Sequence, residues 1–177
     1  MCSSDLDGKW LITISTASEQ TPPVLWDLGQ YRLVARLEGH VGRVFTARFV
    51  AVGGGHEILT AGSDGTARLW DAATGRLRQS FQGDSHFLAD ATVAPGGSVL
   101  VAGGSDGFLR FWDTSSERLL WMLQAHRSYV IGVHYEGDDL VTRGFAGDVT
   151  RWALPSPAKI IRACHASTCA PLATAEN

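Results

Sequence analysis

The sequence has few of the features that mark several large classes of protein. It contains three cysteines and carries a net charge of −3. Three cysteines (Cys2, Cys164 and Cys169) are too few for a disulfide scaffold, and their odd number gives only weak support for a reducing compartment. The chain also has no apolar run as long as a membrane span and no block of basic residues. We therefore expect no membrane span and no nucleic-acid partner.

Glycine, in contrast, is abundant. It accounts for 20 of the 177 residues, while hydrophobic residues make up 45% and charged residues 19%. This composition is typical of a globular chain and not of a disordered one, and the glycines indicate many tight turns. The length is sufficient for one domain with its own hydrophobic core.

A tryptophan motif repeats along the chain at nearly constant spacing. Successive tryptophans of the motif are 44, 42 and 40 residues apart, and the first three are followed directly by aspartate. Glycine-bounded turns precede the last three, with the sequences GSDG, GSDG and GFAG. Three landmarks that keep register over four units indicate an internal repeat. The tryptophans are Trp26, Trp70, Trp112 and Trp152.

Each repeat reads as four short strands. In the second repeat we predict strands at Arg43–Phe49, Glu57–Gly62, Thr66–Asp71 and Arg76–Phe81. Asp64-Gly65 supplies the positive φ angles that a tight hairpin between two of them needs. The segments are too short and too often interrupted by glycine to be helices. One such unit cannot bury both of its apolar faces, so neighbouring units must stack face to face, as the blades of a β-propeller do.

The period, the Gly39-His40 entry and the Trp-Asp exit resemble the WD-repeat family of β-propellers. The resemblance covers residues 7–163. It implies an all-β, open arc of about four antiparallel four-stranded blades, which we place at about residues 7–38, 39–82, 83–124 and 125–163.

The two ends of this array differ from its middle. Nothing before Asp7 resembles a propeller strand, so we expect the first blade to lack its first strand. Residues 1–6 resemble the translated end of a sequencing adapter, and we expect them to be an artefact on a fragment of a longer gene. At the other end, we predict that Ala158–Ala163 is the fourth strand of the last blade and that residues 164–177 form a frayed tail.

One group of polar residues could be mistaken for a catalytic triad. His40, Thr60 and Asp64 could join Trp70 in each-to-next hydrogen bonds, and the resemblance implies that such a group is structural. The third blade keeps Asp106 and Trp112 but has Asp84 in place of the histidine and Ala102 in place of the hydroxyl, with His86 nearby. The fourth blade keeps the other members but has Ala146 in place of the aspartate, with Asp148 nearby. Its remaining members are His126, Thr142 and Trp152. Because the third blade has less to lose, we expect Asp64→Ala to cost more stability than Asp106→Ala.

No residue set in the sequence supplies chemistry or holds a cofactor. Cys164, His165 and Cys169 lack a fourth ligand at zinc-like spacing, so we expect no metal and no catalytic residue. Trp10 and Trp121 are interpreted as packing residues. Partner-binding candidates are residues at or near strand ends, where propeller loops meet other molecules. They are Arg43, Arg68, Arg110, Tyr129 and Arg143.

We therefore expect a non-catalytic protein-interaction or scaffolding module, located in the cytoplasm, whose partners are other proteins or other domains of the same polypeptide. An alternative is the C-terminal sensing propeller of a larger bacterial signalling enzyme, such as a Ser/Thr protein kinase. A hydrolase that uses the central funnel of the propeller is a third, less favoured class.

Overall fold

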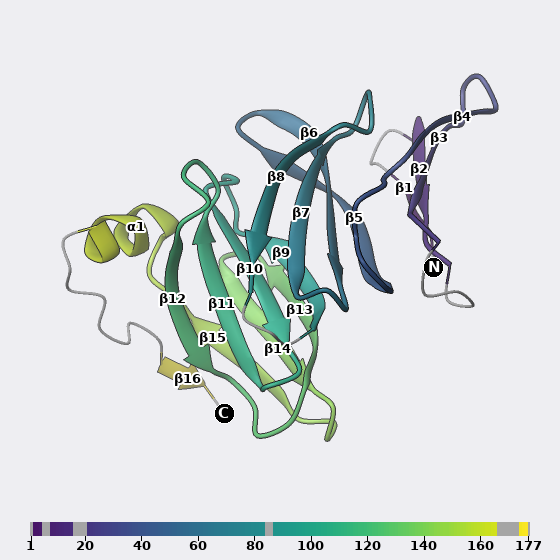
Figure 1. The fold of residues 1–177 in the computed structure, drawn as a ribbon. Helices are drawn as coiled ribbons and strands as arrows, with labels where there is room; N and C mark the ends of the chain where they lie inside the picture. Colours follow the sequence, from purple (N-terminus) through teal and green to yellow (C-terminus); the bar gives the residue numbers. More distant parts are fainter. Residues whose placement is uncertain (1, 5–7, 16–20, 84–86, 166–173, 177) are drawn as a thin grey trace.

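The structure, a computed structural model, describes residues 2–4, 8–15, 21–83, 87–165 and 174–176. This part of the chain forms sixteen strands and one helix, and the strands make four antiparallel sheets of four. Figure 1 shows the sheets following one another in chain order from the N-terminal to the C-terminal end. The predicted all-β architecture of four blades in an open arc is confirmed.

The four sheets have the following bounds. The first contains β1 (Cys2–Ser4), β2 (Trp10–Thr13), β3 (Val24–Asp27) and β4 (Arg32–Arg36). The second contains β5 (Val44–Val52), β6 (Gly55–Gly62), β7 (Thr66–Asp71) and β8 (Leu77–Gln82). The third contains β9 (Leu88–Val93), β10 (Val99–Gly104), β11 (Phe108–Asp113) and β12 (Leu119–Gln124). The fourth contains β13 (Val130–Glu136), β14 (Asp139–Gly144), β15 (Val149–Ala153) and β16 (Thr174–Glu176).

Local sequence explains the hairpins of these sheets. Gly65, Gly107 and Gly147 have φ angles of 72°, 82° and 92°, which only glycine adopts without strain. They close the turns between the second and third strands of the second, third and fourth sheets. In the second sheet, Ile58 pairs with Trp70 and Thr60 with Arg68, so the register places the motif tryptophan beside the strand that carries the hydroxyl.

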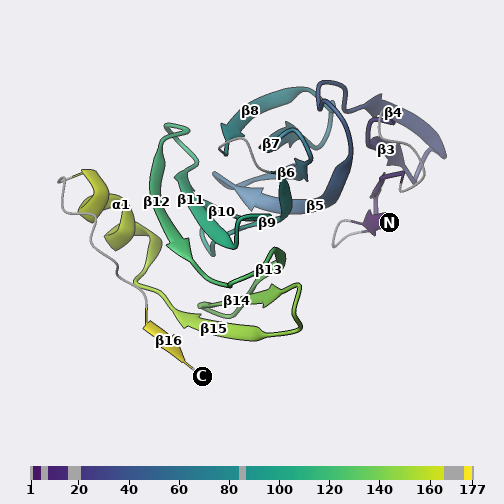
Figure 2. The same cartoon turned by 60° about the horizontal axis from the view of Figure 1, so that its bottom comes forward.

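The sheets radiate from a common side. The innermost strands are β5, β9 and β13, and β9 contacts both of the others. In Figure 2 these three strands lie toward the centre of the arc, while β8 and β12 lie toward its outside. The first strand of each sheet is therefore the inner one and the fourth is the outer one.

Apolar side chains fill the space between neighbouring sheets. Each motif tryptophan after the first packs toward the preceding sheet, and Trp70, Trp112 and Trp152 are 1%, 1% and 5% exposed. Trp121 stacks on Phe111, with ring centroids 4.7 Å apart, and packs against the core between the third and fourth sheets. These cores supply the burial that a single blade could not provide.

A polar contact also joins the three innermost strands. The guanidinium of Arg48 on β5 donates to the carboxylate of Asp90 on β9. The other oxygen of that carboxylate accepts from the backbone N–H of Val133 on β13 at 2.8 Å, and Arg48 donates to the Val133 carbonyl at 3.4 Å. Asp90 therefore holds the inner edges of three blades at a fixed spacing.

The first blade differs from the expectation that its first strand is missing. Cys2–Ser4 forms a three-residue strand, β1, which pairs antiparallel with β2 and aligns Ser3 with Ile12. Since β2 offers an unpaired edge on that side, even a short segment without propeller-like sequence can add to it.

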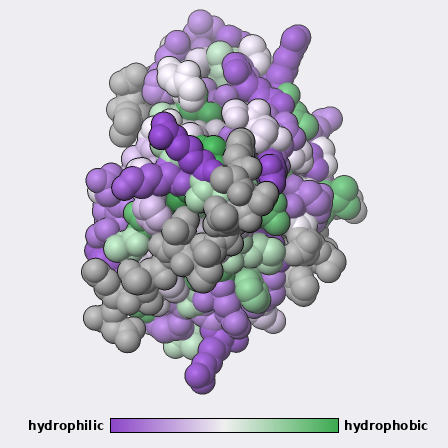
Figure 3. Space-filling view, turned by 90° about the vertical axis from the view of Figure 1, so that its left-hand side faces the viewer, coloured by the Kyte–Doolittle hydropathy of each residue, from purple (hydrophilic) through white to green (hydrophobic). Residues whose placement is uncertain are grey.

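The prediction for the last outer strand is wrong. Residues 157–165 form the helix α1 (Pro157–His165), and the outer strand is β16, whose Ala175 pairs with Trp152. Proline suits the first position of a helix because it has no N–H to leave unpaired. Ile160 and Cys164, four residues apart, are 2% and 4% exposed and join the core of the fourth blade. The side of the molecule that carries α1 is mostly hydrophilic, with scattered apolar residues (Figure 3). Within the described residues, no helix combines the length and the apolar character needed to cross a bilayer.

Candidate functional site

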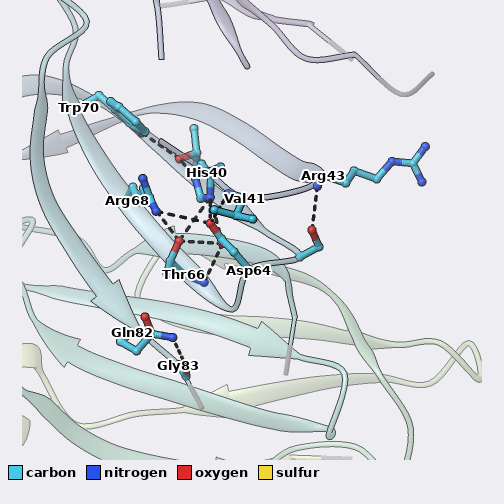
Figure 4. A network of polar contacts seen from close by, with 11 residues as sticks. His40, Val41, Arg43, Asp64, Thr66, Arg68, Trp70, Gln82 and Gly83 are labelled. Atoms are coloured by element: carbon cyan, nitrogen blue, oxygen red, sulfur yellow. Dashed lines mark hydrogen bonds and ion pairs between the residues drawn. The ribbon is translucent and has the colours of Figure 1, made fainter. Parts of the chain in front are cut away.

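The second blade contains a continuous network of polar side chains at one end of its strands (Figure 4). The indole N–H of Trp70 donates to the hydroxyl of Thr60 at 2.8 Å. The Thr60 hydroxyl lies 2.8 Å from Nε2 of His40, and Nδ1 of His40 lies 2.9 Å from the carboxylate of Asp64. A neutral imidazole with its proton on Nδ1 satisfies every one of these bonds.

Asp64 is the centre of this network. Its carboxylate also accepts from the backbone N–H groups of Val41 and Thr66 and from the Thr66 hydroxyl, and Arg68 lies 3.5 Å away. Burial raises the pKa of the Asp64 carboxyl, but the hydrogen bonds from His40, Val41 and Thr66 outweigh it and hold that pKa well below its usual range. Asp64 thus ties the entry loop, which carries His40 and Val41, to the β6–β7 turn.

The fourth blade contains the same network with a different acid. Nε2 of His126 lies 2.8 Å from the hydroxyl of Thr142, which accepts from the Trp152 indole at 2.9 Å. Nδ1 of His126 bonds to Asp148, and this bond lowers the pKa of the Asp148 carboxyl. Ala146 occupies the turn position that Asp64 has in the second blade, so Asp148 supplies the missing carboxylate.

The third blade replaces the histidine with an arginine. The guanidinium of Arg110 on β11 donates to Asp106 at 2.6 and 3.2 Å. Burial raises the pKa of Asp106, but the hydrogen bond from Arg110 outweighs it and the net shift is downward. Asp84 and His86 lie outside the described residues, and Ala102 is fully buried in the core that also holds Trp112.

The first blade has a partial network that the sequence analysis missed. The indole N–H of Trp26 donates to the hydroxyl of Thr13 at 3.2 Å, as Trp70 does to Thr60. The signal was available, since Thr13 stands 13 residues before its tryptophan on the neighbouring strand. The long turn between β2 and β3 hid the correspondence, because the other blades place this hydroxyl 10 residues before the tryptophan.

The hydroxyls of these networks cannot serve as nucleophiles. Thr60 and Thr142 are 0% exposed, and each already accepts from an indole and bonds to an imidazole. A nucleophile must present a lone pair to a substrate, and a fully enclosed hydroxyl presents none. The networks therefore hold the loops to the sheets. Among the described residues, no group of three or more His, Cys, Asp or Glu is placed to hold a metal ion. Cys164 is disulfide-bonded, while Cys169 lies outside the described part.

The partner-binding candidates separate into exposed and buried residues. Arg143 is exposed and Tyr129 is 47% exposed, while Figure 4 shows the Arg43 side chain extending away from the network. Arg68 is mostly covered and contacts Thr66 and Asp64. Arg110 is wrong as a surface candidate, because it is 1% exposed and paired with Asp106. Strand position alone did not show that it replaces the missing histidine.

Four radially arranged, four-stranded antiparallel sheets with their inner strands side by side define a β-propeller. Residues 31–71 and 75–113 match the family described as WD domain, G-beta repeat. These two segments are WD repeats, and the resemblance seen in the sequence is confirmed. Each match contains the outer strand of one sheet and the first three strands of the next: β4 with β5–β7, then β8 with β9–β11. No curated relative matches the sequence significantly.

Solved structures share the fold. The crystal structure of the computationally designed Ika4 protein is similar with a TM-score of 0.73 and 19% identity, over 87% of this chain and 89% of that chain. The computationally designed Ika8 protein, in a crystal structure described as crystal packing No.1 in P63, is similar with a TM-score of 0.70 and 20% identity. That match covers 85% of this chain and 44% of that chain. At these identities the likeness shows the fold alone.

Proposed function

We propose that this chain is a non-catalytic scaffold that presents a rigid propeller surface to other proteins. WD repeats on a propeller fold make it a protein-interaction module in general terms, and such repeat domains are typically non-catalytic. The observation that carries the proposal is the use of the polar residues. The His-Thr-Asp groups are buried and recur in the second and fourth blades, as supports of the fold do and an active site does not.

The same reasoning supports protein over nucleic acid as the partner. The net charge is −3, and binding to a phosphate backbone requires clustered lysine and arginine. Other domains of the same polypeptide are also proposed partners. An open, largely apolar hollow of about 310 Å³ on the outer face of the first blade would suit a further packed element; Leu11, Trp26 and Tyr31 are among its lining residues.

Two narrower proposals remain from the sequence. One is attachment to a larger signalling enzyme such as a kinase, and the upstream gene sequence tests it: a glycine-rich nucleotide loop and a catalytic aspartate would support it. The other is a cytoplasmic location. The disulfide at Cys164 weighs against it, because such bonds are rare in reducing compartments. Mass spectrometry after alkylation without reduction tests the location through the state of this cysteine.

The proposed scaffold function is tested by direct binding. Cross-linking mass spectrometry in the native cell identifies neighbours, and calorimetry with the purified chain and each purified neighbour measures affinity. We expect at least one neighbour to bind directly and no turnover by the chain. Robust turnover that is lost in His126→Ala, with an unchanged circular dichroism spectrum, would contradict the proposal.

A further inference from the structure

A row of aromatic rings crosses three blades at one end of the inner strands. Phe45, Phe87 and Tyr129 stand 42 residues apart, each at the start of an innermost strand. Their ring centroids are 5.3 Å apart from Phe45 to Phe87 and 5.6 Å apart from Phe87 to Tyr129. Phe145 extends the row, with its centroid 5.9 Å from that of Tyr129. We refer to Phe45, Phe87, Tyr129 and Phe145 as the aromatic row.

The row becomes exposed at the fourth blade. Phe145 is 69% exposed and Tyr129 is 47% exposed, whereas Phe45 and Phe87 are half-buried. Phe145 stands where the other turns have a serine, and the Ser63 hydroxyl accepts from the backbone N–H of Arg43. Nothing in the turn itself therefore requires an aromatic ring. Adjacent exposed rings with supporting rings behind them are typical of the centre of a binding surface.

The charges around the exposed rings are mainly positive. Arg127 and Arg143 are exposed, and each stands two residues before one of the exposed rings. The carboxylates of the three hairpin turns are already engaged: Asp64 by His40, Asp106 by Arg110 and Asp148 by His126. Positive charge beside the row is thus left for a partner, and it complements an acidic one.

A hollow beside the row offers a place for an acidic side chain. It has a volume of about 600 Å³, and Arg127, Ser128 and Asp148 are among its lining residues. The Ser128 hydroxyl is buried and has no hydrogen-bond partner among the described residues. A hydroxyl and a guanidinium that line one hollow can both donate to a carboxylate. The Asp148 carboxylate opposes this least because it bonds to His126.

We propose that the aromatic row, together with Arg127, Arg143 and Ser128, binds an extended acidic segment of a partner protein. An aromatic or large aliphatic side chain of the segment packs on Tyr129 and Phe145. A neighbouring Asp or Glu enters the hollow and accepts from Arg127 and Ser128. The row is roughly as long as five residues of extended chain, at about 3.3 Å per residue. This inference rests on the proposed scaffold function and adds the surface and the chemistry of the partner.

An unbiased peptide-display library, selected against the whole 177-residue chain, tests the inference. We expect enriched peptides with Asp or Glu around an aromatic or aliphatic residue, and competition between them for one site. A fluorescein-labelled synthetic copy of the most enriched peptide then serves as the probe in anisotropy measurements. Phe145→Ser and Arg127→Glu should each weaken its binding at least tenfold. Phe145→Ser restores the residue that the other turns carry, so we expect the fold to persist.

Matched control variants lie at the other end of the strands. Arg118→Glu makes the same charge change as Arg127→Glu, and Leu119→Ser removes another exposed apolar side chain, so both should leave binding within twofold. Enriched peptides that are neutral or basic, or that bind Phe145→Ser unchanged, would overturn the inference but leave the scaffold function standing. A library from which nothing is enriched would count against both.

Discussion

Asp148 reaches His126 from the position that Thr66 occupies in the second blade, two residues beyond the turn position of Asp64. Thr66 and Asp148 each stand four residues before their tryptophan. Both blades nevertheless place a carboxylate on Nδ1 of the entry histidine. The contact is therefore kept although the residue that provides it has moved. The two acids differ in exposure, since the Asp64 side chain is 11% exposed and the Asp148 side chain is 49% exposed.

We predict that Asp64→Ala destabilises the chain more than Asp148→Ala. Loss of Asp64 leaves a buried imidazole and two backbone N–H groups without their acceptor, which costs about 1–3 kcal/mol. At Asp148, water can reach the histidine through the adjoining hollow. Urea midpoints of the two variants measure the difference, with exposed Asp138→Ala as the control. Equal midpoints would show that exposure does not set the cost.

Stability should fall as the pH falls below about 5. The folded-state pKa of Asp64 lies below the value of about 3.9 for an unfolded chain. Its contribution is therefore complete above the unfolded pKa and is lost as the pH falls toward the folded pKa. Asp106 acts in the same direction, while burial raises the pKa of Glu57 and opposes it. Urea midpoints between about pH 3 and pH 6 should slope less steeply in Asp64→Asn. An unchanged slope would remove Asp64 from the explanation.

Asp106→Ala should cost at least as much as Asp64→Ala, which reverses the order expected from the sequence. It leaves the guanidinium of Arg110 buried without its carboxylate, and a stranded buried charge costs about 3–5 kcal/mol. Adding Arg110→Met should restore most of this loss, because an apolar side chain of similar length suits a buried site. Thermal or urea unfolding of the single and double variants completes the cycle. A double variant no more stable than Asp106→Ala would acquit Arg110.

Trp26→Phe should cost much less stability than Trp70→Phe. Trp70 is 1% exposed and donates to the buried Thr60, so the change costs about 2 kcal/mol in lost packing and an unpaired hydroxyl. Trp26 makes the matching bond to Thr13 but lines an open hollow, where water covers what the change removes. Urea unfolding measures both. Equal costs would mean that another surface covers the first blade in solution.

The repeat and its hairpins could be predicted because they depend on short-range signals. The tryptophan spacing fixed four units, and the Asp-Gly turns placed β6 and β7 to within a few residues. The residues of the second-blade network also come together where the repeat indicated, because entry loop, turn and strand are held by the same sheet. The assignment of Thr60 as the hydroxyl agrees with its 2.8 Å contacts.

Predictions that depended on distant contacts were less accurate. The apolar spacing of Ile160 and Cys164 suits a helix, but its selection over a strand depends on the core of the fourth blade, which the local sequence does not show. The burial of Arg110 follows from the lost histidine in the same blade. The aromatic row had a readable signal in the 42-residue spacing of Phe45, Phe87 and Tyr129. It went unread because the tryptophan period dominated the comparison.

The offset between the WD repeats and the sheets makes neighbouring blades interdependent. Residues 31–71 supply the outer strand β4 to the first sheet and the inner strands β5–β7 to the second. Opening of that one segment would strip an edge from one sheet and the centre from the next. Backbone amides on β3 and β8, although they belong to different blades, would then lose their protection from hydrogen exchange in a single event. The unit of local unfolding in this molecule is thus a pair of adjoining blades, even though the unit of sequence is one repeat.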